Sequence, residues 1–134
     1  MRIGDAARFS GVSAKLIRYY EARRLLSPAG RDASGYRVFN ERNVHELRFI
    51  KRARSLGFPI SQIDELLGLW RDKKRPSRKV RALAVRHRDA VADRMDAHRA
   101  IIDVLSRLID ACKGDERPDC PILDELSKGR ARAR

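Results

Sequence analysis

The two cysteines of this 134-residue chain lie on one short polar stretch, ACKGDERPDC, at residues 111–120. Cys112 and Cys120 are separated by a segment that contains Gly114 and Pro118. Such a loop is a poor place to bury small hydrophobic side chains, so packing alone does not explain the pair. Thiolates are both metal ligands and redox-active groups. The spacing therefore predicts a metal site, with a disulfide-based redox switch as the alternative.

The donor set indicates which metal ion would fit. Two thiolates cannot complete the four-ligand shell that structural zinc prefers. We interpret the three histidines as ordinary surface or seam residues because none lies within the loop: His45, His87 and His98. Soft monovalent d10 ions accept few, sulfur-rich ligands, and Cu(I) is the biologically common one. We expect near-linear coordination by two sulfurs, with apolar neighbours excluding water and backbone N–H groups or a helix dipole offsetting the net charge of −1.

A long helix that ends near Ala111 would position the loop. Residues 71–81 form a basic linker or helix start, and the helix that follows carries apolar or seam residues at steps of four and three. These residues are Val91, Met95, His98, Ile102, Leu105, Ile109 and Cys112. One helix cannot bury such a heptad seam, so the pattern predicts an antiparallel homodimer; packing on the chain's own N-terminal domain is the alternative. The stretch PILDEL after the loop predicts one or two further helical turns.

The first 70 residues predict a winged helix-turn-helix domain. Two short helices flank a Gly-containing turn, and Ser13 is placed to cap the second one, residues 14–26. Residues 27–40 predict a loop and a short hairpin, the wing, with Gly35 at its turn. A third helix is expected at about 41–55 with Asn40 as its cap.

A fourth helix is expected at 61–70. Ser61 and Asp64 resemble a capping box at its start.

The charge favours nucleic acid as partner. The 31 Lys and Arg against 18 Asp and Glu give +13, which attracts polyanions. A helix that enters the major groove needs donors for phosphates and base edges. We expect these DNA contacts from the second helix, the wing and the third helix: Ser13, Lys15, Arg18, Tyr19, Tyr20, Tyr36, Arg37 and Arg54, with Lys51 and Arg52 nearby.

Other classes of protein find little support. No segment offers the roughly 20 apolar residues of a membrane span, and no secretory signal is present, so a cytoplasmic location with reduced thiols is expected. No His–carboxylate pair, nucleophile motif or phosphate-cradling glycine loop indicates an enzyme. An architectural, sequence-indifferent DNA-binding protein remains a rival reading of the charge.

The stretch LIRYYEARRLLSPAGRDASGYRVF, residues 16–39, resembles the mercury-resistance regulator (MerR) family. That family carries IRYYE, GL, P.R and GYR.Y in this order. Leu25 stands where Gly is usual, and Phe39 stands where Tyr is usual. The resemblance runs from Ile3 to about Trp70 and less specifically through the long helix. It implies a dimeric winged helix-turn-helix protein with an antiparallel coiled coil and an effector site at the coil's end.

The loop itself is similar to that of the copper-efflux regulators in this family, which carry AC.GD….DCPI. The resemblance implies that Cys112 and Cys120 bind Cu(I), Ag(I) or Au(I), and that Ser77 stands where divalent-metal sensors have a third Cys. It further implies activation of resistance genes through distortion of promoter DNA that RNA polymerase then uses. A divalent-metal or redox sensor of the same family is the alternative.

The predicted organisation is mainly α. A winged helix-turn-helix domain occupies residues 1–70, and a linker and dimerisation helix occupy 71–111. The metal-binding loop and a short helix follow at 112–127, and a disordered basic tail at 128–134.

Overall fold

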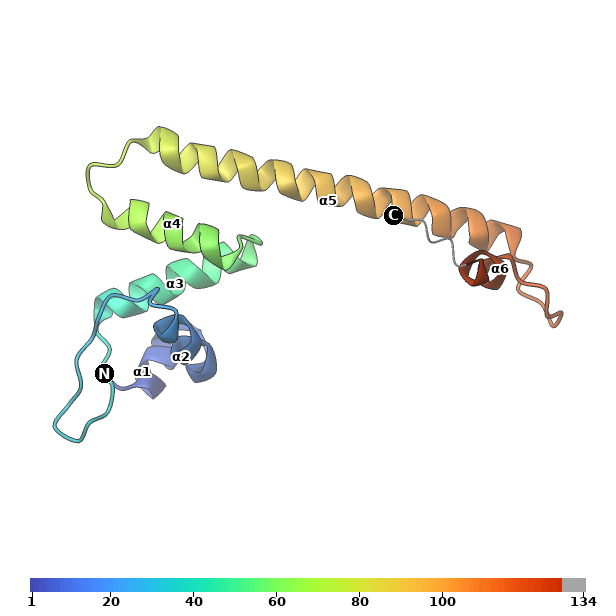
Figure 1. The fold of residues 1–134 in the computed structure, drawn as a ribbon. Coiled ribbons are helices and arrows are strands. Elements are labelled where there is room, and N and C mark those ends of the chain that lie inside the picture. The colour runs from blue at the N-terminus through green and yellow to red at the C-terminus, as the bar shows by residue number, and fades with distance from the viewer. Residues whose placement is uncertain (129–134) are drawn as a thin grey trace. The chain divides into compact units, whose positions relative to one another are not determined.

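The computed structural model describes residues 1–128 and is mainly α-helical, as predicted (Figure 1). The described part of the chain has six helices: α1 (Ile3–Ser10), α2 (Ala14–Ala22), α3 (Glu41–Ser55), α4 (Ile60–Arg71), α5 (Ser77–Ala111) and α6 (Pro121–Ser127). The tail predicted at 128–134 lies, apart from Lys128, outside the described residues. None of the described helices is both long enough and apolar enough to span a bilayer.

Helices α1 to α4 enclose the core of the N-terminal part. Its largest fully buried apolar side chains are Ile17, Leu25, Phe39, Leu47, Ile50, Ile63 and Leu67. These residues come from α2, the loop after it, the end of the wing, α3 and α4, so one small core holds all of these elements together. The partly buried Ile3, Phe49 and Phe58 pack against it.

The helix-turn-helix follows from two local signals. Gly11 ends α1 in the left-handed region at φ 76°, which only glycine adopts without a steric cost. The hydroxyl of Ser13 accepts a hydrogen bond from Leu16 N at 3.2 Å, which confirms the predicted cap of α2. Helix α2 ends at Ala22, four residues before the predicted end.

A left-handed residue explains the early end of α2. Arg24 has φ 60°, and the chain then turns so that Leu25 and Leu26 enter the core from a loop. The backbone conformation that favours glycine is therefore found at position 24, whereas the resemblance placed the family's usual glycine at position 25.

The wing is less regular than the predicted hairpin. A single antiparallel bridge joins Arg31 and Arg37, and Gly35 at the turn has φ 84°. One carboxylate oxygen of Asp32 accepts the backbone N–H groups of Ser34 and Tyr36 at 2.9 and 3.1 Å, so side-chain bonds replace part of the missing ladder.

The starts of α3 and α4 differ in kind. Asn40 and Asn43 form a reciprocal capping box at α3, which confirms Asn40 as the cap. The capping box predicted at Ser61 is wrong. Helix α4 begins at Ile60, its N-cap is Pro59, and no side chain caps it. A proline fixes an extended entry to the helix without any side-chain hydrogen bond, and this signal outweighed the serine.

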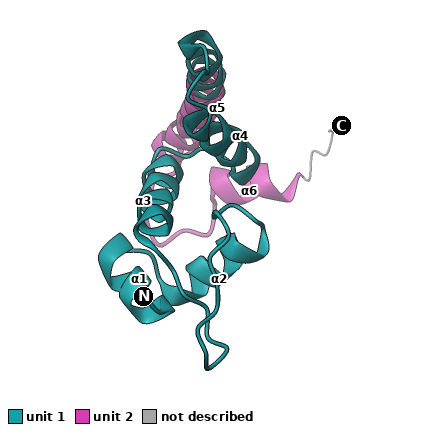
Figure 2. Cartoon of the chain, turned by 90° about the vertical axis from the view of Figure 1, so that its left-hand side faces the viewer, with its two compact units in different colours: residues 1–87 teal, residues 88–134 magenta. Residues whose placement is uncertain are grey.

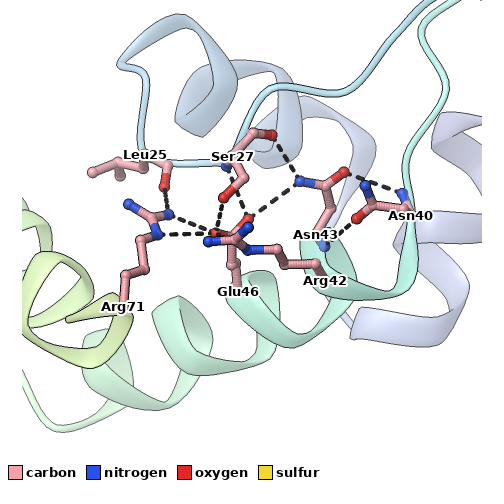
Figure 3. A network of polar contacts seen from close by, with 7 residues as sticks. All are labelled: Leu25, Ser27, Asn40, Arg42, Asn43, Glu46 and Arg71. Atoms are coloured by element: carbon pink, nitrogen blue, oxygen red, sulfur yellow. Dashed lines mark hydrogen bonds and ion pairs between the residues drawn. The ribbon is translucent and has the colours of Figure 1, made fainter. Parts of the chain in front are cut away.

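A buried polar network joins α3 and α4 to the loop after α2 (Figure 3). The carboxylate of Glu46, whose side chain is 2% exposed, accepts bonds from Ser27 Oγ at 2.6 Å and Arg71 Nη2 at 2.7 Å. Arg71 also donates to the carbonyl of Leu25, and Asn43 Nδ2 donates to the carbonyl of Ser27 at 2.9 Å. Burial alone would raise the pKa of Glu46, but the bonds from Ser27 and Arg71 outweigh it and hold the pKa below its ordinary value.

Residues Met1–His87 and the part from Arg88 onward form two compact units, coloured teal and magenta in Figure 2. The N-terminal unit therefore extends beyond residue 70 and includes the first turns of α5. Helix α5 begins at Ser77, within the stretch 71–81 expected to be a linker or helix start, and it ends at Ala111 as predicted. Helix α6 matches the turns expected from PILDEL.

Candidate DNA-binding face and metal site

Helix α2 presents its polar side outward. Ser13, Lys15, Arg18 and Tyr19 are all exposed, whereas Ile17 is fully buried. Tyr20 is only 4% exposed and belongs to the core, so its prediction as a DNA contact is corrected. Its ring instead lies beside that of Tyr19, with centroids 5.7 Å apart.

The two predicted wing residues have different surroundings. Tyr36 is 57% exposed. The guanidinium of Arg37 forms an ion pair with Glu21 of α2, and Arg37 Nη1 lies 3.5 Å from the carbonyl of Ala29. Arg37 therefore ties the wing to α2 within the protein, and 38% of its side chain remains exposed.

Two basic residues near the wing were missed by the sequence analysis. Arg2 lies over the Tyr36 ring, with its guanidinium carbon 4.1 Å from the ring centroid, and it pairs with Asp32 at 2.9 Å. Arg31 donates to the carbonyl of Gly35 at 2.8 Å. Both line a depression of about 710 Å³ together with Arg18, Tyr36 and Arg37. No motif marks Arg2, because its partners Asp32 and Tyr36 lie 30 or more residues away along the chain.

The end of α3 adds a further basic surface. Lys51, Arg52 and Arg54 are exposed, while Ala53 between them is buried. The N-terminal unit thus presents cationic side chains from α2, the wing and the end of α3, the arrangement that a phosphate backbone requires.

The two thiols lie at the two ends of the loop between α5 and α6. Cys112 directly follows α5, and its N–H donates to the carbonyl of Leu108 at 3.1 Å. Cys120 is the N-cap of α6. The backbone N–H groups of Leu123 and Ile122 and the nearby side chain of Cys112 lower the pKa of the Cys120 thiol, against an opposing effect of desolvation.

Within the described residues, the thiols lack the water-excluding apolar surroundings that the sequence predicted. Both cysteines are free and only partly buried, so residues 1–128 of one chain do not exclude water from them. The acidic loop residue Asp115 is bound to its neighbour Arg117, whose backbone and side-chain N–H groups lower the pKa of the carboxyl.

Other candidate ligands lie elsewhere or are otherwise engaged. His87 is buried and contacts the carbonyl of Leu56, and His98 contacts the carbonyl of Arg94 one turn earlier. Ser77 is the first residue of α5, and it belongs to the N-terminal unit. Over the described residues no cluster of three or more His, Cys, Asp or Glu side chains is placed to hold a metal ion.

The predicted seam of α5 is open to solvent in the single chain. Its exposed apolar members are Val91, Met95, Ile102, Leu105 and Ile109, with exposed fractions between 42% and 60%. The seam residue Leu105 and its neighbours Ile101 and Val104 also line a groove of about 450 Å³ together with Leu126 of α6.

Family models match most of the chain. Residues 1–69 match the model described as MerR HTH family regulatory protein, and residues 44–108 match MerR, DNA binding. The chain belongs to the MerR family of helix-turn-helix transcription regulators, and the proteins of this family are regulators and not enzymes.

Relatives and solved structures give the same assignment. The HTH-type transcriptional regulator HmrR of Sinorhizobium medicae is 49% identical over all of this chain and 91% of its own length. The regulator CueR of Salmonella typhimurium is 33% identical over 95% of this chain and 92% of its own. The lead(II) complex of the regulator PbrR691 from Ralstonia metallidurans superimposes with a TM-score of 0.84 at 28% identity, covering 94% of this chain and 98% of that one. The chain is thus a metal-responsive regulator of the MerR family.

Proposed function

We propose that this regulator senses Cu(I), with Ag(I) and Au(I) as alternative effectors, and activates metal-resistance genes from promoter DNA. The observation that carries the proposal is the placement of both free thiols at the ends of one short loop, Cys112 directly after α5 and Cys120 as the N-cap of α6. Two sulfurs on one short loop can take one ion between them after an adjustment of that loop. The similarity of the loop ACKGDERPDCPI to that of the copper-efflux regulators supports the same assignment.

The residues present fit a monovalent soft ion. A cation held by two thiolates leaves a net charge of −1 on the site. The backbone N–H groups of Leu123 and Ile122 at the start of α6 already lower the pKa of the Cys120 thiol, so they would offset part of that charge. A bound Cu(I) would supply a bridge between the end of α5 and the start of α6. Because both thiols must deprotonate, binding should weaken as the pH falls.

The acting species we propose is an antiparallel homodimer. The exposed apolar seam of α5 supports this, because such a stripe is stable in water only when a partner covers it. A two-fold dimer would present two copies of the basic face made by α2, the wing and the end of α3. We assign Ser13, Lys15, Arg18, Tyr19, Tyr36, Arg37 and Arg54 to this face, with Arg37 acting mainly through the position of the wing.

The activation by metal follows from the coupling between metal binding and conformation. An effector shifts an equilibrium only through its different affinity for two conformations, so Cys112 and Cys120 would hold the ion more tightly in the activating form. By family resemblance, that form bends and untwists the promoter so that RNA polymerase can use it.

Transcription from the regulated promoter with purified protein tests the proposal. Under strictly reducing conditions we expect activation by Cu(I), and loss of activation in Cys112→Ser and in Cys120→Ser. The matched control is Ser127→Ala, an exposed residue of the same region. Activation by oxidant without metal, or uniform protection of unrelated DNA in a footprint, would contradict the proposal and favour a redox switch or an architectural protein.

The lead(II) complex of a relative favours a second candidate, a divalent-metal sensor. Ser77 argues against it, because a neutral hydroxyl lacks thiolate donor strength. The Ser77→Cys variant should gain a response to Zn(II) or Pb(II) if the position faces the loop of a partner. A wild-type response to Zn(II) equal to that for Cu(I) would favour the divalent sensor.

A further inference from the structure

One histidine on α5 attaches the dimerisation helix to the DNA-binding part of the N-terminal unit. Of the 35 residues of α5, the buried ones are Leu83 and His87. They are four residues apart and so lie on the same face of the helix. His87 is the last residue of the N-terminal unit, and α5 continues from it toward the thiol loop.

His87 contacts the turn between α3 and α4 in two ways. Its Nε2 lies 2.7 Å from the carbonyl oxygen of Leu56, and because a carbonyl only accepts, Nε2 carries the proton. Its ring also stacks on Phe58, with centroids 4.1 Å apart and 29° between the planes. The side chain is 6% exposed, so both contacts are shielded from water.

The backbone of this turn is shaped around the histidine. Gly57 has φ 86°, and a Cβ added there would lie 3.4 Å from His87 Nε2. That separation is an ordinary van der Waals contact, so the imidazole fits directly against the glycine. A larger residue at position 57 would be strained by its backbone conformation.

The connection between α3 and α4 is held by hydrogen bonds to the last helical turn of α3. The N–H groups of Gly57 and Phe58 donate to the carbonyls of Arg54 and Ala53 at 2.9 and 3.1 Å. Arg52 and Arg54 project from this same turn into solvent. A displacement of α5 at His87 would therefore move the backbone that carries these two arginines.

We propose that His87 is a positioning residue that couples α5 to the DNA-contacting end of α3. It sets where Arg52 and Arg54 meet the promoter, and it transmits the change that effector binding imposes on α5. This inference rests on the proposed function for its regulatory part. Its structural part, the fixing of the turn by His87, can be tested without metal or DNA.

Three variants separate the two contacts. His87→Gln keeps an N–H donor, His87→Phe keeps an aromatic ring without the donor, and His87→Ala removes both. His45→Ala is the matched control, since His45 is an exposed histidine of the same N-terminal unit and lies outside the seam of α5.

The first measurement is hydrogen exchange of backbone amides in the metal-free protein. We expect His87→Ala to accelerate exchange at Gly57 and Phe58 by about threefold to thirtyfold, while amides of α1 and α2 exchange as before. His87→Gln should restore most of the protection. Equal exchange in His87→Ala and wild type, or acceleration throughout the unit, would overturn the positioning role.

The second measurement compares three quantities for each variant. These are the Cu(I) affinity from competition with a chelator, the affinity for the DNA fragment that the wild type protects, and the activation ratio, which is transcription with Cu(I) divided by transcription without it. We expect His87→Ala to lower the activation ratio by about threefold to thirtyfold with Cu(I) affinity unchanged. An activation ratio equal to that of wild type would overturn the coupling. If the wild type itself does not respond to Cu(I), the proposed function fails, whereas the exchange measurement still decides the role of His87.

Discussion

At the scale of the residue, adjacent side chains of one type have opposite roles. Tyr19 is 46% exposed on the outer side of α2, and Tyr20 is 4% exposed in the core. Helical periodicity places Tyr20 with Ile17, so the sequence pattern was sufficient to exclude it from the DNA face. Arg37 is different, because its ion pair with Glu21 depends on how the wing folds back onto α2, and no local pattern indicates that contact.

Arg18 is the exposed arginine of α2 whose loss should act on DNA directly. It forms no salt bridge with the described residues, so Arg18→Ala should leave the fold intact and weaken promoter binding by about 1–3 kcal/mol. Fluorescence anisotropy at fixed salt measures the affinity. Arg99→Ala removes the same charge from the part of α5 outside the N-terminal unit and is the control. Equal losses in both variants would indicate that only net charge matters.

Glu46 should make stability depend on pH. Because its pKa is held below the ordinary value in the folded state, it stabilises the fold above about pH 4.3 and less as the pH falls through the lowered pKa. Glu46→Gln leaves Arg71 without its carboxylate partner, so we expect a loss of about 1–3 kcal/mol at pH 7. Urea unfolding at pH 7 and at about pH 3 measures the difference, which should shrink at the lower pH. A difference that is the same at both pH values would contradict this role.

At the scale of the element, hydrophobic periodicity predicted the helices well. The bounds of α3, α5 and α6 agree closely with expectation, since each has a marked start or end. The errors occur where backbone conformation decides. Arg24 in the left-handed region shortens α2, Pro59 begins α4 in place of Ser61, and Asp32 replaces strand pairing in the wing. Hydrophobic periodicity does not indicate these features, because each depends on the backbone conformation of single residues or on a local side-chain bond.

The two serines near helix starts give a matched pair of variants. Ser13 caps α2, so Ser13→Ala should destabilise the N-terminal unit by about 1 kcal/mol. Ser61 is exposed inside the first turn of α4 and caps nothing, so Ser61→Ala should change stability by less than about 0.5 kcal/mol. Chemical unfolding measures both. A larger loss at Ser61 than at Ser13 would contradict the assignment of the caps.

At the scale of the whole molecule, the candidate sites were found from two independent kinds of signal. The thiol pair came from residue chemistry, and the basic face came from charge placed on predicted elements. The contacts of Arg2 and His87 were missed, because each joins segments about 30 residues apart and has no motif of its own. The apolar seam of α5 is not covered by any other part of residues 1–128, so a surface outside this chain would have to cover it.

The seam predicts how the protein assembles in solution. In an antiparallel dimer Ile102 would face the partner helix, so Ile102→Glu would bury a carboxylate without a counter-ion and should weaken association by about 3 kcal/mol or more. Ala97→Glu adds the same charge at an exposed position off the seam and should leave association intact. Sedimentation at micromolar concentration should give twice the 15.4 kDa mass of one chain for the wild type and Ala97→Glu, and a monomer fraction for Ile102→Glu. A wild type that sediments at the mass of one chain would show that the seam has another use, and the two-fold presentation of the basic face would then fail with it.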